Sequence, residues 1–271
     1  MNYGSFALLH LALWLCWLTG CTPDLTEERA TFASFDGTHI AYTEVGNGPP
    51  VVLIHGFISD GSSWEQTALK QQLIESGYQV IVPDLRGNGA SDQPKDPQRY
   101  ADDAEVKDLR ALADHLELGN YAAVGYSRGA IVLAKLLTQE PRISRGVLGG
   151  MGLDFTNPQW DRRRMFAEAF GGTQPLNEVT RGAVEYAKSV GANLHILSYL
   201  QQFQPVTSVA ELRQVQTPVL VVAGDADRDN GEPAALQQAL PHSELEIVPG
   251  DHNQTYKTEA FATAVLRFLE E

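Results

Sequence analysis

Cysteine is scarce in this chain of 271 residues, because only Cys16 and Cys21 occur and both stand near the N-terminus. The rest of the chain therefore has no disulfide framework. No Cys/His cluster has the spacing of a metal site, so we expect neither a metal nor another cofactor.

Basic residues are also few, with 20 Lys and Arg against 34 Asp and Glu, a net charge of −14 and a sequence pI of about 4.9. Nucleic acid is excluded as a partner, since phosphate binding needs clustered Lys and Arg. Hydrophobic residues make up 43% of the chain, which is enough for a packed core, and the length suits one sizeable domain.

One long hydrophobic run is present, over residues 6–18 (FALLHLALWLCWL). It is short for a bilayer span and fits the apolar region of a signal peptide. The run ends in LTGC (18–21), which resembles the lipobox of bacterial lipoproteins, although residues 1–9 lack the Lys or Arg with which signal peptides usually begin. We expect removal of residues 1–20, lipidation of Cys21 and a tether over 21–30. A plain secretory signal or a membrane anchor is the alternative.

The lipobox resemblance implies a membrane-anchored protein of the bacterial cell envelope. Thr22 follows Cys21, and by resemblance to the sorting rules of Gram-negative bacteria a residue other than Asp at this position indicates the outer membrane. A secreted or periplasmic protein is the alternative location.

From residue 31 onward, apolar segments alternate with helical patterns. Strands are predicted at 39–45, 50–56, 78–84, 121–126, 145–152, 217–225 and 244–250, and helices at 64–76, 102–117, 130–139 and 258–269. This alternation predicts an α/β fold with a mostly parallel sheet covered on both faces, whose strands end at one rim where ligands bind. Residues 153–215 interrupt the pattern with scattered aromatic side chains, and we expect them to form a helical cap over that rim. The cap aromatics and Trp64 line an acyl pocket or pack as core; the sequence leaves both open.

The segment VGYSRGA (124–130) places Ser127 between Gly125 and Gly129. A predicted strand precedes it and a predicted helix follows, as in a nucleophile elbow, where small neighbours permit a sharp turn and the helix N-terminus favours a developing oxyanion. The alternative is a helix-capping serine. A nucleophilic serine needs a base and an orienting acid from the same rim. Asp225, Asp227 and Asp229 follow one late strand and His252 follows the next.

The order Ser, Asp, His resembles that of the α/β-hydrolase family over residues 31–271. HGF (55–57) is similar to the family's oxyanion loop, and DLRGNGASD (84–92) is similar to its D-x-R-G-x-G-x-S loop. The resemblance implies that Ser127 is the nucleophile and that His252 is the general base and later the acid. It implies Asp227 as the orienting acid, three residues after Gly224, with Asp225 or Asp154 as alternatives. The backbone N–H groups of Phe57 and Arg128 would form the oxyanion hole.

Some positions depart from relatives of this family. A serine nucleophile disfavours a resemblance to epoxide hydrolases and haloalkane dehalogenases, which use Asp, and no HGGG loop is present. Arg128 stands where many esterases carry Met or Gln, and Asp251 separates Gly250 from His252. We expect a structural hydrogen-bonding role for His55 and a loop-fixing role, by pairing, for Asp84 and Arg86. The run DRRR (161–164) attracts an anionic substrate or, as we favour, forms a solvated helix face.

These features predict a serine hydrolase that cleaves a small ester through an acyl-enzyme. The same triad serves thioesterases, C–C hydrolases, aminopeptidases and perhydrolases, and the fold does not choose among them. A non-enzymatic alternative is a small-molecule-binding protein that retains the pocket.

Overall fold

The computed structural model describes residues 27–271. The predicted signal peptide (1–20), Cys21 and most of the predicted tether lie outside the described residues. Within the described range, no helix has both the length and the apolar character needed to cross a membrane.

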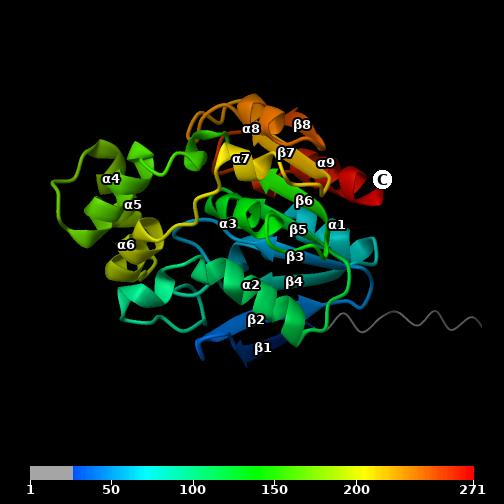
Figure 1. The fold of residues 1–271 in the computed structure, drawn as a ribbon, viewed down its shortest axis with the longest axis horizontal. Coiled ribbons are helices and arrows are strands. Elements are labelled where there is room, and N and C mark those ends of the chain that lie inside the picture. Colours follow the sequence, from blue (N-terminus) through cyan, green and yellow to red (C-terminus); the bar gives the residue numbers. More distant parts are fainter. Residues whose placement is uncertain (1–26) are drawn as a thin grey trace, which may run out of the picture.

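An eight-stranded sheet forms the centre of the described part (Figure 1), in the order β1-β2-β4-β3-β5-β6-β7-β8. The strands are β1 (Glu28–Ala33), β2 (His39–Val45), β3 (Pro50–Ile54), β4 (Gln79–Pro83), β5 (Tyr121–Tyr126), β6 (Ile143–Gly149), β7 (Val219–Gly224) and β8 (Ser243–Val248). Strands β3 to β8 are parallel, whereas β2 pairs antiparallel with both β1 and β4. The mostly parallel α/β fold is thus confirmed, and its parallel strands end at one rim.

Strand β1 was not among the predicted strands, and it takes residues 28–30 out of the predicted tether. Its sequence, ERATFA, lacks the continuous apolar run that marks the buried strands. It lies at the sheet edge and pairs with β2 only, so one neighbour supplies its backbone hydrogen bonds and its outer side chains stay in solvent.

Helices cover both faces of the sheet. The helices α2 (Ala104–His115), α3 (Arg128–Leu137) and α8 (Pro233–Ala239) pack on one face, and α1 (Ala68–Glu75) and α9 (Glu259–Glu270) pack on the other. Alternate residues of β3 show why its sequence is apolar throughout: Val52 and Ile54 belong to one core, Val51 and Leu53 to the other. The helix predicted at 64–76 starts later, because Thr67 caps α1 through the N–H of Lys70.

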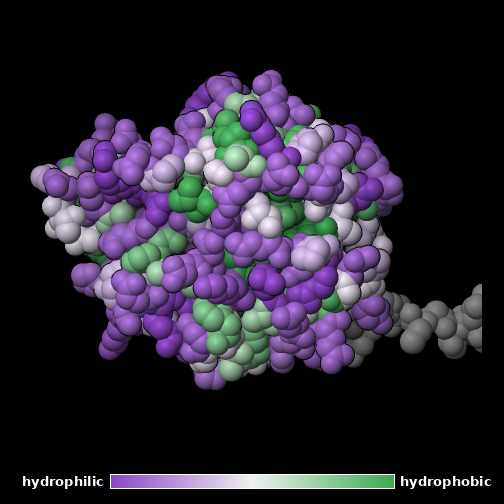
Figure 2. Space-filling view, in the orientation of Figure 1, coloured by the Kyte–Doolittle hydropathy of each residue, from purple (hydrophilic) through white to green (hydrophobic). Residues whose placement is uncertain are grey.

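The predicted cap is helical, with α4 (Asp161–Gly171), α5 (Glu178–Ser189) and α6 (Leu194–Gln202) grouped beside the sheet (Figure 1). These helices share a small core of their own that includes Phe166, Phe170, Val184 and Leu197. The short helix α7 (Val209–Leu212) instead packs into the main core through Leu212. The face shown in Figure 2 is largely hydrophilic, with small hydrophobic patches scattered over the body and near its junction with the cap.

Candidate active site

Ser127 occupies a sharp turn between β5 and α3. Its φ is +53°, in the left-handed region that non-glycine residues seldom adopt, and such strain concentrates at functional sites. Both flanking glycines are required by space: a Cβ on Gly125 would lie 2.4 Å from the Gly129 carbonyl oxygen, and one on Gly129 would lie 2.2 Å from the Ile54 carbonyl oxygen. Ser127 makes no side-chain capping bond to α3, so the helix-capping alternative is wrong.

A chain of hydrogen bonds links Ser127 to the two loops predicted to face it. Ser127 Oγ lies 2.9 Å from His252 Nε2, and His252 Nδ1 lies 2.8 Å from Asp227 Oδ2. Because an ionised carboxylate only accepts, Nδ1 carries the proton and Nε2 is free to accept from the serine hydroxyl. Asp251 does not displace this loop; its carboxylate accepts the N–H groups of Asn253 and Gln254 at 2.9 Å and fixes the turn that presents His252.

The structure brings Asp227, and neither of its alternatives, to the histidine. The Asp225 carboxylate accepts the Gly250 N–H at 3.0 Å. Asp154 lies against Gly231, where a Cβ would meet its carboxyl group at 2.7 Å. Asp229 donates its N–H to Asp227 Oδ1 at 3.1 Å and thereby holds the second carboxylate oxygen.

Two residues that the sequence did not single out support His252. The Tyr126 hydroxyl donates to the His252 carbonyl oxygen at 2.7 Å, and its ring lies 5.5 Å from the imidazole. The Asn230 amide nitrogen lies 3.4 and 3.5 Å from the two imidazole nitrogens and 3.1 Å from the Gly150 carbonyl oxygen. Both stand beside predicted site residues in the sequence, but nothing in the pattern shows where their side chains point.

The loop after β3 reaches the serine. A Cβ on Gly56 would lie 3.5 Å from Ser127 Cβ and 4.0 Å from its Oγ, which places the Phe57 backbone beside the elbow. The Arg128 backbone begins α3 directly after the serine. In the turns and loops of residues 27–271, neither the Phe57 nor the Arg128 N–H has a backbone acceptor. Both predicted oxyanion donors are therefore close to Ser127 and available.

A cavity of about 590 Å³ opens above the serine between body and cap. Trp160 and Tyr186 line it, and Phe155 is core. Trp64 and Phe166 do both, since they border the cavity and also belong to buried core clusters. Phe57 packs on Phe166 and Phe170 at ring distances of 5.9 and 5.4 Å, so the oxyanion loop rests on the cap.

The Arg128 side chain, unusual at this position, turns away from the chemistry. Its guanidinium forms a two-pronged ion pair with Glu105 of α2, with one contact of 2.7 Å, and donates to the Leu200 carbonyl oxygen of α6 at 2.9 Å. Arg128 and Glu105 are each only 3% exposed. The side chain thus ties the elbow to α2 and to the cap.

Breaking this pair should be costly. We expect Glu105→Ala to lower the free energy of unfolding by about 3–5 kcal/mol, because it leaves a buried guanidinium without its counter-charge. The double variant Glu105→Leu/Arg128→Met should recover most of that loss, since an apolar pair needs no charge compensation. Urea unfolding followed by circular dichroism measures both. A loss below 1 kcal/mol in Glu105→Ala would contradict a buried, mutually dependent pair.

The other polar residues of these loops have structural contacts. His55 is buried, accepts the Leu85 N–H at Nε2 (3.0 Å) and lies with Nδ1 2.9 Å from the Gly56 carbonyl oxygen. Asp84 accepts the N–H groups of Gly61 and Ala90, each at 2.8 Å. Arg86 does not pair with Asp84; it binds Asp108 and Asp36.

Burial of His55 predicts a pH effect on stability. Desolvation lowers the pKa of its imidazole below the ordinary 6.5, so the unfolded chain takes up a proton that the folded chain refuses. The free energy of unfolding should therefore fall as pH drops below about 6.5, with a slope of at most ~1.4 kcal/mol per pH unit from this group, and His55 should add no pH dependence above that range. Urea unfolding at pH 7.5, 6.5 and 5.5 should show a shallower fall in His55→Gln. Parallel slopes would refute the assignment.

The arginines of DRRR separate into different roles. Arg162 lines the cavity, with its guanidinium 5.0 Å from the centre of the Phe166 ring and 3.7 Å from Asp229. Arg163 donates to the carbonyl oxygens of Gln201 and Gln202 at the end of α6. Only Arg164, which pairs with Asp161 and is largely exposed, fits the expected solvated face.

Comparison with known proteins agrees with this architecture. Residues 49–166 match the family described as alpha/beta hydrolase fold. A Synechocystis protein named "Putative non-heme chloroperoxidase" is 31% identical over 265 residues, covering 84% of this chain and 92% of that protein. The structure of a bromoperoxidase from Bacillus anthracis matches 90% of this chain and 100% of its own, with a TM-score of 0.70 and 26% identity.

A shorter part of the chain is similar to a protein of Siraitia grosvenorii named Epoxide hydrolase 3. The two are 42% identical over 94 residues, which are 35% of this chain and 28% of that protein. In residues 27–271, no group of three or more His, Cys, Asp and Glu side chains has the arrangement of a metal site. The order of the strands, the matched family and the Synechocystis relative, which aligns over most of this chain, agree. The chain belongs to the α/β-hydrolase fold family.

Proposed function

We propose that the protein is a serine hydrolase that cleaves a carboxylic ester. One observation carries the proposal: the hydrogen-bonded series from Ser127 Oγ through the His252 imidazole to the Asp227 carboxylate, with contacts of 2.9 and 2.8 Å. This series sits in a cavity between body and cap that can take a small acyl substrate. Such an arrangement activates a serine as a nucleophile.

The reaction follows from the positions of the groups. Ser127 Oγ attacks the ester carbonyl carbon while His252 Nε2 takes the hydroxyl proton. The Phe57 and Arg128 N–H groups stabilise the oxyanion. Collapse breaks the bond to the alcohol, which receives the proton from His252, and leaves an acyl-enzyme. Water then donates a proton to His252 while its oxygen attacks the acyl carbon. His252 returns this proton to Ser127 Oγ as the bond to the acyl group breaks, which restores the serine and releases the carboxylic acid.

A second candidate is transfer of the same acyl group to hydrogen peroxide. It is favoured by the haloperoxidase names of two relatives that match most of this chain. Peroxide would replace water in the second half of the reaction and yield a peracid and free serine, so the same three side chains serve both outcomes. An epoxide hydrolase activity is disfavoured, because the elbow carries Ser127 and not the aspartate that such enzymes use.

A fluorophosphonate probe tests the proposal without knowledge of the substrate. We expect one covalent adduct on the peptide that contains Ser127, none in Ser127→Ala and slower labelling in His252→Ala. No adduct on the folded wild-type protein would contradict a nucleophilic serine and favour a binding protein. Product analysis of p-nitrophenyl acetate turnover with and without hydrogen peroxide then separates hydrolysis from peracid formation.

A further inference from the structure

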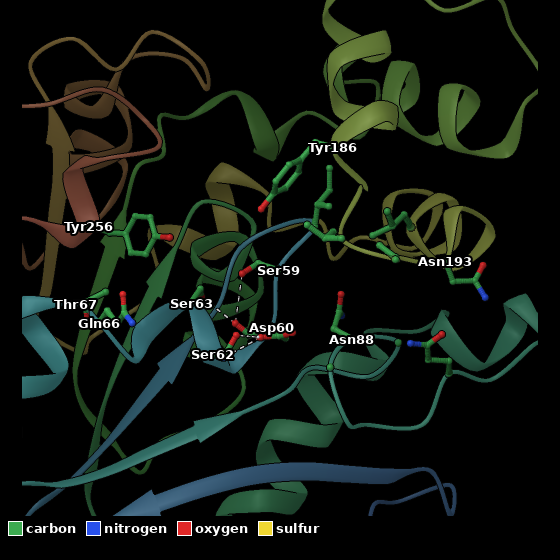
Figure 3. Close-up of a pocket in the computed structure, with 18 of the residues that line it drawn as sticks. Ser59, Asp60, Ser62, Ser63, Gln66, Thr67, Asn88, Tyr186, Asn193 and Tyr256 are labelled. Atoms are coloured by element: carbon green, nitrogen blue, oxygen red, sulfur yellow. Dashed lines mark hydrogen bonds between the residues drawn. The ribbon is translucent and has the colours of Figure 1, made fainter. Parts of the chain in front are cut away.

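A second hollow of about 650 Å³ adjoins the cavity at Ser127, between residues 58–67 of the body and the cap helices α5 and α6 (Figure 3). The two spaces share one wall, formed by Ile58, Ser59, Ser63, Tyr186, Tyr256 and Lys257. The hollow and the cavity at Ser127 are therefore adjacent, and Ser127 lines only the second.

The two spaces differ in chemistry. Phe57, Ile131, Met151 and Phe166 contribute apolar side chains to the cavity at Ser127. The hollow is lined largely by hydroxyl and amide side chains, such as Ser59, Ser62, Ser63, Gln66, Asn88 and Gln93. This division suits an ester with an apolar acyl group on one side of the carbonyl carbon and a hydrophilic alcohol on the other.

Two tyrosines stand where the hollow meets the cavity. Figure 3 shows Tyr186 reaching from the cap toward Ser59, while Tyr256 enters from the body with its hydroxyl turned toward the same space. Tyr186 is 55% exposed, a large apolar ring left without cover in the described chain. A tyrosine offers a ring face and a hydroxyl at little cost in conformational entropy. Sugars match this pair of properties, since they have C–H groups on their ring faces and hydroxyls around the edge.

The charged side chains around the hollow favour an uncharged ligand. Lys257 is the one cationic side chain that lines the hollow in residues 27–271, and Asp60 opposes it with a negative charge. A phosphate or carboxylate group would call for clustered cations. Gln66 and Gln93 line the hollow and are exposed, so their side-chain amides can donate to and accept from a neutral partner.

We propose that this hollow binds the alcohol half of the ester, and that this alcohol is an uncharged sugar or a related polyol. The inference rests on the proposed ester hydrolysis at Ser127 and names the substrate class of that site. Its aromatic and amide groups recognise the leaving alcohol, while the cavity at Ser127 holds the acyl group.

Two acetate esters that share an acyl group test the inference. We expect kcat/KM for 6-O-acetylglucose to exceed that for ethyl acetate by at least tenfold. The double variant Gln66→Leu/Gln93→Leu should lower this ratio by about threefold to tenfold for each lost hydrogen bond. Gln216→Leu is the matched control: Gln216 is exposed and precedes the start of β7, at the end of the parallel strands opposite the site, so the ratio should stay at the wild-type value.

The outcomes are distinct. Equal kcat/KM for the two esters, both lost in Ser127→Ala, would overturn the sugar proposal and leave the hydrolase standing. A preference unchanged in the double glutamine variant would remove the hollow as its source and equally overturn the proposal. No Ser127-dependent turnover of either ester, or of p-nitrophenyl acetate, would overturn the proposed function and this inference with it.

Discussion

Ser127→Ala should lower kcat for p-nitrophenyl acetate by roughly 10⁴–10⁶-fold, because removal of the nucleophile from a triad that acts as a unit abolishes the acyl-enzyme route. The residual rate would come from the oxyanion donors and from substrate binding alone. KM should change far less, since the hydroxyl makes its main interaction in the transition state. Stopped-flow release of p-nitrophenol should lose its burst phase in the variant.

The control for this experiment is Ser144→Ala. Ser144 lies near the start of β6, at the end of the sheet opposite the site, and its hydroxyl donates to the Tyr121 carbonyl oxygen. We expect wild-type turnover from it. A Ser127→Ala protein that is folded by circular dichroism and retains more than a tenth of the wild-type kcat would refute the nucleophile assignment.

Asp227→Asn should lower kcat by roughly 10⁴-fold near neutral pH. The carboxylate is 5% exposed on its side chain and sits 2.8 Å from His252 Nδ1, where it fixes the tautomer and stabilises the imidazolium that forms. An amide of the same shape supplies no negative charge and permits the wrong tautomer. The binding of substrate should be little altered, because Asp227 is not among the residues that line the cavity at Ser127.

Asp225→Asn is a matched test for this second prediction, since it makes the same chemical change two residues earlier on a side chain that faces Gly250. Its kcat should fall by less than tenfold. Steady-state kinetics of the two variants with the same ester show which of the two aspartates is the orienting acid. Comparable losses, or a larger loss in Asp225→Asn, would show that the acid is not Asp227.

Local pattern was sufficient for the parallel strands and the elbow. The segments around Val51–Ile54 and Tyr121–Tyr126 are apolar at every position because both sheet faces are covered, and this leaves a strong signal in sequence. The edge strand Glu28–Ala33 leaves no such signal, since only one neighbour and one face define it. The hydrophobic pattern also did not locate the start of a helix where a capping side chain sets it, as Thr67 does for α1.

The sequence by itself determined the order of a serine, an aspartate and a histidine and the spacing of the two glycines around Ser127, because these depend only on residue type and on position along the chain. Only the tertiary structure decided which aspartate reaches His252, that Tyr126 binds the His252 carbonyl oxygen while Asn230 lies beside the imidazole, and that the Arg128 guanidinium is buried against Glu105 and not offered to a substrate. Those contacts join segments far apart in the chain. Their geometry is set by the crossing of strands and the placement of the cap, and no local pattern records it.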